Sequence, residues 1–175
     1  MGILGDIDLG GNTLIVKDIK TGAQSAGQVS NVRQTTPAGS TLTVTRASHA
    51  GRTILLDTLT GSVVTLPAAA GTGDKYRFFA SVAPTSNNHI VKVANASDTM
   101  VGTLYTVTTT IAAAFSALGA EAAGGTDDTI TMNGTTTGGI AGTLITCVDI
   151  ATNLWLIDGQ LVGSGTIATS LSATV

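Results

Sequence analysis

The residues with side chains suited to acid–base chemistry are few. His49 and His89 are the only histidines, the residue type whose ordinary pKa lies near neutrality. Ser48, His49 and Asp57 supply the three groups of a hydrolase triad, but a chain rich in serine and threonine offers such sets by chance. Neither histidine stands in a local pattern with an acid and a nucleophile. We therefore predict that the protein is not an enzyme and that both histidines are solvated residues at strand ends.

The single cysteine and the single tryptophan both have the spacing of strand residues. Cys147 alternates with Ile145 and Asp149, which predicts a small buried side chain on a strand. No nearby cation or helix start would lower its thiol pKa, and one cysteine permits no intrachain disulfide. Trp155 alternates with Ile157, so we interpret it as a core residue, with glycan stacking as the weaker alternative.

Two further patterns match ligand sites only in part. Asp127 and Asp128, with Asn133 nearby, offer oxygen ligands to Ca²⁺, but their spacing fits no known calcium loop. Adjacent acids before a strand also occur as ordinary turn caps. The glycines of the 71–75 turn lack the spacing of a phosphate-binding loop, and a strand rather than a helix follows them. We predict no metal and no cofactor.

The composition indicates a protein that works through its surfaces. Hydrophobic residues make up 43% of the 175 residues, whereas charged residues make up only 11% and the net charge is −3. No cluster of lysine and arginine is present to bind nucleic acid or an anionic membrane, and no apolar stretch is long enough to span a bilayer. The first residues also lack the pattern of a signal peptide, so we expect synthesis in a host cytoplasm. The mean hydropathy of +0.38 suggests a surface that is covered by partner subunits.

From residue 41 the chain predicts an all-β domain, a β-sandwich or a jelly-roll-like fold. Short runs with strand character are separated by glycine, proline and asparagine turns, without alternating helices. The predicted strands are 41–45, 53–57, 62–66, 76–82, 90–94, 104–111, 129–132, 143–150 and 154–157, and the turns include Asp158–Gly159. One alanine-rich run, 111–125, fits a short helix and a loop with β character equally well.

Residues 1–40 are predicted to form an extended N-terminal arm. The arm contains one strand candidate, 13–19, followed by a stretch poor in core-forming residues. Its apolar side chains would have no cover on an isolated monomer, and such an arm can add a strand to a neighbouring subunit. The predicted contacts with the capsid or a subunit are Ile3, Leu4, Ile7, Leu9, Leu14 and Val16.

Two windows of this sequence resemble bacteriophage capsid decoration proteins, also called cement or head-stabilising proteins. In residues 62–79 a Thr-Leu-Pro strand end leads to a glycine-rich turn, and in residues 127–159 a glycine-bounded strand precedes a tryptophan and a glycine. The resemblance implies a trimeric all-β protein of the virion that binds the major capsid protein on the outer surface of an icosahedral shell. It thereby stabilises the shell.

Other functions remain open at this point. Related modules occur in tail fibres, so a tail-fibre or receptor-binding module is the main alternative, although the chain has few aromatic residues for sugar stacking. A small hydrolase is disfavoured by the scarcity of histidines and acids, and a surface-layer or adhesin repeat by the lack of a secretion signal.

Overall fold

The computed structural model describes residues 8–9, 12–13, 35–109 and 118–175. The chain divides into two compact units, Met1–Arg33 and Gln34–Val175. In the first unit, β1 (Asp8–Leu9) pairs with β2 (Asn12–Thr13) in an antiparallel hairpin. The second unit begins at Gln34, so residues 35–40, which the sequence analysis assigns to the arm, belong to the folded domain.

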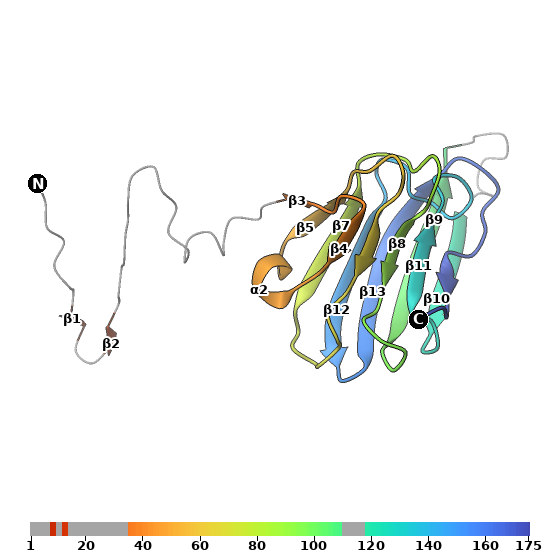
Figure 1. Cartoon of the computed structure of the whole chain (residues 1–175). Helices are drawn as coiled ribbons and strands as arrows, with labels where there is room; N and C mark the ends of the chain where they lie inside the picture. The colour runs from red at the N-terminus through yellow and green to blue at the C-terminus, as the bar shows by residue number, and fades with distance from the viewer. Residues whose placement is uncertain (1–7, 10–11, 14–34, 110–117) are drawn as a thin grey trace, which may run out of the picture. The chain divides into compact units, whose positions relative to one another are not determined.

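The second unit is a sandwich of two mixed β-sheets (Figure 1). The seven-stranded sheet consists, in spatial order, of β10 (Leu118–Gly124), β9 (Thr99–Thr108), β13 (Leu154–Gly163), β12 (Leu144–Ala151), β7 (Lys75–Ala80), β5 (Thr53–Leu56) and β3 (Thr35–Pro37). The five-stranded sheet consists of β14 (Leu171–Ser172), β11 (Thr129–Met132), β8 (His89–Lys92), β6 (Val63–Thr65) and β4 (Thr41–Thr43). One helical turn, α2 (Arg46–His49), lies between β4 and β5.

The first six strands of the sandwich wind alternately through the two sheets. β3, β5 and β7 run parallel in one sheet, and β4, β6 and β8 run parallel in the other. The later strands close the sheets mainly by antiparallel pairing, except that β9 runs parallel to β13. The all-β prediction is therefore confirmed. Of the two predicted architectures, the structure has the sandwich, because the winding of the first six strands does not follow the antiparallel order of a jelly roll.

The core lies between the sheets and follows the alternation of each strand. Burial alternates along most of β12 and β13, which places Ile145, Cys147, Trp155 and Ile157 inside. The ring of Trp155 packs edge-on against Tyr76 from β7, with ring centroids 5.8 Å apart. The predicted core positions of Cys147 and Trp155 are confirmed.

The predicted strands from residue 41 onward all appear, but β9 begins five residues earlier than predicted and β13 ends six residues later. Within the second unit three strands were missed, namely β3, β10 and β14, and the described part of the alanine-rich run, from Leu118, is strand. The predicted turn at Asp158–Gly159 is wrong, because both residues lie inside β13. An alanine Cβ at position 159 would come within 2.6 Å of the Leu144 carbonyl oxygen, so the glycine allows close approach of β12 and β13 rather than a turn.

Candidate functional site

Both histidines are buried and form hydrogen bonds with backbone groups. The prediction that they are solvated is therefore wrong. The Nδ1 atom of His49 accepts a hydrogen bond of 2.9 Å from the backbone N–H of Thr45. Asp57 accepts the backbone N–H of Gly39 at 3.3 Å. Within the described residues, no hydrogen bond joins Ser48, His49 and Asp57 into a triad.

His89 is fully buried at the start of β8, and both of its ring nitrogens are engaged. Nδ1 accepts the backbone N–H of Ser62 at 3.1 Å, and Nε2 lies 2.8 Å from the carbonyl oxygen of Val82. An imidazole that accepts at Nδ1 and donates at Nε2 is the neutral form. Burial lowers the pKa of His89 below 6.5, although the Val82 bond and the charge of Asp57 work in the opposite direction.

We expect the stability of the domain to fall as the pH decreases below about 6.5. In that range the unfolded chain protonates His89 while the folded chain keeps it neutral, and the loss continues down to the lower folded-state pKa. Urea unfolding at several pH values between 7.5 and 5 would measure the slope. His89→Gln should reduce the slope, and an identical slope in the variant would show that other groups cause it.

Cys147 lies in the core with no exposed surface. Burial raises the pKa of its thiol to about 12, so the reactive thiolate is disfavoured at neutral pH. This side chain therefore contributes packing in the folded protein rather than nucleophilic chemistry.

The acidic pair at residues 127 and 128 binds backbone groups of its own chain. Asp128 accepts the backbone N–H groups of Thr174 and Val175 at 2.8 and 3.1 Å and the hydroxyl of Thr129 at 2.7 Å. Asp127 accepts the backbone N–H of Gly124 at 3.1 Å. In the described ranges, no three histidine, cysteine, aspartate or glutamate side chains gather as a metal site would require. Asp128 thus fixes the C-terminal residues to the start of β11.

The glycine-rich turn at 70–73 surrounds a carboxylate that comes from β12. The two carboxylate oxygens of Asp149 accept the backbone N–H groups of Ala70, Gly71 and Thr72 at 2.7–3.1 Å, and the hydroxyl of Thr72 at 2.8 Å. Burial works to raise the pKa of Asp149, but these hydrogen bonds outweigh it and hold the pKa below 3.8. The donors of this turn are therefore already satisfied by the protein itself.

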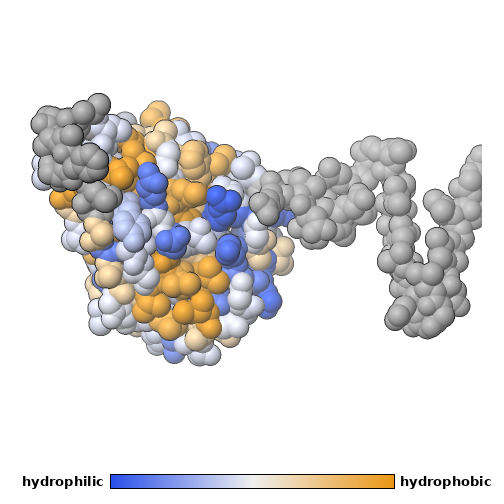
Figure 2. Space-filling model, turned by 180° about the vertical axis from the view of Figure 1, so that it is seen from behind, coloured by the Kyte–Doolittle hydropathy of each residue, from blue (hydrophilic) through white to orange (hydrophobic). Residues whose placement is uncertain are grey.

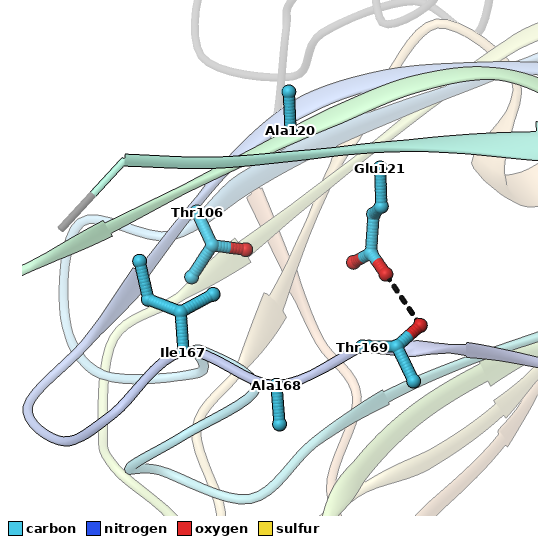
Figure 3. A pocket seen from close by; sticks show the side chains of 6 residues that line it. All are labelled: Thr106, Ala120, Glu121, Ile167, Ala168 and Thr169. Carbon is cyan, nitrogen blue, oxygen red and sulfur yellow. Dashed lines mark hydrogen bonds between the residues drawn. The ribbon is translucent and has the colours of Figure 1, made fainter. Parts of the chain in front are cut away.

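A small cavity of about 260 Å³ lies between β10 and the segment that precedes β14 (Figure 3). It is lined by Thr106, Ala120, Glu121, Ile167, Ala168 and Thr169. The carboxylate of Glu121 accepts the hydroxyl of Thr169 at 2.7 Å and the backbone N–H and hydroxyl of Ser170. These bonds tie one sheet to the other, and we interpret Glu121 as a structural clamp.

The outer face of the seven-stranded sheet is the most distinctive surface of the domain. The outward-pointing residues of neighbouring strands form three rows that run across the sheet. This is because residues directly opposite each other in paired strands share a face of the sheet. The first apolar row contains Leu55, Phe79, Leu144, Gln160, Tyr105 and Ala120. The polar row contains Thr53, Arg77, Thr146, Asp158 and Thr103. The second apolar row contains Val148, Leu156 and Val101, and it ends on β7 at the charged residue Lys75.

We call this surface the striped face. Figure 2 shows hydrophobic patches on both sides of a group of hydrophilic residues on this side of the molecule. Three large apolar side chains on it are strongly exposed: Tyr105 by 46%, Ile150 by 42% and Leu156 by 40%. A free sheet face normally carries polar residues, so an exposed face of this composition is typical of a protein–protein contact.

A shallow hollow of about 370 Å³ lies on the same face. It is lined by Tyr105, Gly142, Leu144, Thr146, Asp158, Gly159 and Gln160. Arg77 and Asp158 are the opposite charges of the polar row, and within the described residues neither of them belongs to an ion pair of the chain, since the ion pair there is that of Arg46 with Asp74 at 2.7 Å. The striped face therefore offers apolar area, a recess and three charged residues that form no ion pair within the described part of the chain: Lys75, Arg77 and Asp158.

Sequence reasoning missed the striped face, although β12 carries a signal for it. The run from Leu144 to Ile150 has apolar residues at both alternating sets of positions, so that Leu144 and Val148 point outward while Ile145 and Cys147 point inward. When a strand in an antiparallel pair has apolar side chains on both sides, we expect other residues to pack against each side.

The predicted arm contacts fall mainly outside the described residues. This holds for Ile3, Leu4, Ile7, Leu14 and Val16, and for most of the predicted strand 13–19. Leu9 lies in β1, opposite Asn12. No helix in the described ranges combines the length and the apolar character needed to cross a membrane.

Comparison of the chain with protein-family models, with curated proteins and with solved structures found no match.

Proposed function

We propose that this protein is a structural component of a bacteriophage virion that binds the outer surface of an icosahedral capsid and stabilises it. The observation that carries the proposal is the striped face, where Tyr105, Ile150 and Leu156 are each at least 40% exposed. A concentration of large exposed apolar side chains on one sheet face indicates a protein that functions by binding other subunits. The resemblance of residues 62–79 and 127–159 to decoration proteins supports the capsid as the place of that work.

The domain is held together in a way that suits a protein that stabilises a shell. Three carboxylates fix separate segments of the backbone: Asp149 holds the 70–72 turn, Asp128 holds the C-terminal residues, and Glu121 holds the segment before β14. In each case charge-assisted hydrogen bonds hold a loop or terminal segment against the sheets. In this proposal the partners are the major capsid protein and further copies of the chain, arranged as the trimer that the resemblance implies, and no enzymatic activity is involved.

The copy number in virus particles tests the proposal directly. Quantitative mass spectrometry of purified particles should find this chain in numbers comparable to the major capsid protein. A handful of copies per particle would instead indicate the tail-fibre alternative, and absence from particles would refute a virion role.

Deletion of residues 1–11 is expected to weaken attachment to capsids while the domain stays folded. The compact unit begins at Gln34, so the deletion removes no strand of the sandwich. Binding of the truncated and full-length chains to undecorated capsids can be compared by co-sedimentation, with circular dichroism as the control for folding. Equal binding by both chains would contradict the predicted role of Ile3, Leu4, Ile7 and Leu9.

A further inference from the structure

We propose that the striped face packs against the striped face of a second copy, around a two-fold axis that runs along β12. The inference rests on the proposed function only in taking this face as a protein contact, and it names the partner. The arrangement of charge across the central strands supports this contact, because it is complementary to itself under one particular rotation.

The charges of the polar row lie symmetrically about β12. Thr146 in this strand pairs with Arg77 of β7 on one side and with Asp158 of β13 on the other. Neighbouring strands lie about 4.8 Å apart, so the two charged residues stand about 10 Å from each other with Thr146 midway between them. A positive and a negative side chain are therefore placed at equal distances on opposite sides of one strand.

A two-fold axis in the plane of contact and along β12 exchanges the two sides of the face. Arg77 of one copy then faces Asp158 of the other, and the symmetry repeats the contact, so one interface contains two ion pairs. An axis across the strands would instead place Arg77 against Arg77 and Asp158 against Asp158. Like charges in close contact are unfavourable, and the charge pattern therefore selects the axis along β12.

The same rotation brings each of the two mainly apolar rows onto its counterpart, although Lys75 of one copy then faces Leu156 of the other and Phe79 faces Gln160. Each row keeps its height along the strands, so the two apolar rows meet their own counterparts on either side of the polar row. Leu144 and Val148 lie on the axis and meet themselves, and Leu156 and Phe79 are covered near it. Packed sheets with nearly aligned strands are a common arrangement, with a separation of about 10 Å that side chains of this size fill.

A contact of this kind is separate from the proposed trimer. A ring of three copies joins two different surfaces of each chain, whereas the two-fold contact joins one surface to itself. Both contacts can occur in one assembly, with the striped faces joining copies from two neighbouring trimers.

The experiment is a charge exchange in the full-length chain, read by sedimentation velocity over a range of concentrations. We expect the wild-type chain to contain the two-fold pair and the single variants Arg77→Asp and Asp158→Arg to raise its dissociation constant by about tenfold or more, since each creates two like-charge contacts. The double variant Arg77→Asp/Asp158→Arg should return to within about threefold of the wild type. Lys92→Asp, a charge reversal on the five-stranded sheet, is the matched control and should leave the association unchanged.

Several outcomes would overturn the inference. These are a wild-type chain that stays monomeric at the highest concentration tested, an association that ignores both single variants, and a double variant as weak as the singles. Val148→Asp provides a second variant, because it places two carboxylates against each other on the axis and should abolish the pair. A chain that decorates capsids in high copy but shows no two-fold pair would refute this inference and leave the proposed function standing, whereas a charge-dependent pair absent from particles would do the reverse.

Discussion

Gly102→Ala is expected to destabilise the domain by about 4 kcal/mol or more, enough to prevent folding in many domains of this size. Gly102 lies in β9 with a φ of +133°, a backbone conformation that residues with a side chain rarely adopt. A Cβ atom at this position would overlap with the carbonyl oxygen of Ile157 on the paired strand. Because β9 and β13 pair over ten residues, the strain acts on the longest strand pairing of the seven-stranded sheet.

Gly124→Ala is the matched control for this prediction. Gly124 lies in β10, where an added Cβ atom meets nothing within 4 Å, and its φ is outside the glycine-favouring region. A change of less than about 1 kcal/mol is expected there. Urea unfolding followed by circular dichroism gives both values. If the two alanine variants were equally stable, the close approach of β9 and β13 at Gly102 would be incorrect.

Trp155→Ala is expected to lower the free energy of unfolding by about 3–5 kcal/mol. Trp155 is the largest of the fully buried side chains and packs edge-on against Tyr76. Its removal leaves a cavity between β13 and β7 that the surrounding strands cannot fill, because their own hydrogen bonds hold them in place. Urea unfolding measures the loss.

Leu59→Ala provides the comparison for a large apolar residue outside the core. Leu59 is 59% exposed in the turn after β5, so its replacement should change the stability by less than about 1 kcal/mol. A Trp155→Ala variant as stable as Leu59→Ala would place the indole on the surface and revive the glycan-stacking interpretation.

Alternation in the sequence predicted most of the strands correctly, because burial of one side of a strand leaves a period of two. The strands around Cys147 and Trp155 illustrate this, and their core positions followed from their neighbours alone. Glycine was a less reliable signal. At Asp158–Gly159 it permits close contact between strands, and a sequence does not distinguish this use from a turn.

The missed features depend on partners that are distant in the sequence. β10 is rich in alanine and glycine and becomes a strand because it pairs with β9 over seven residues. The buried state of His89 depends on hydrogen bonds with Ser62 and Val82, which belong to other segments. The striped face likewise exists only when β7, β12 and β13 lie side by side, which places Arg77 and Asp158 on either side of Thr146.

The parallel pairing of β9 with β13 affects how the domain can fold while it is synthesised on the ribosome. β9 is complete at Thr108, but its partner ends at Gly163, and β12, which fills the place beside β7, ends at Ala151. While the chain emerges, the six winding strands can assemble early, but the edge of β7 that pairs with β12 and the edge of β9 that pairs with β13 stay open until residues 144–163 have been made. Unpaired strand edges pair with other chains. A nascent or prematurely terminated product therefore exposes aggregation-prone edges that are paired in the finished protein. We therefore expect slow or interrupted translation to increase the aggregation of this protein.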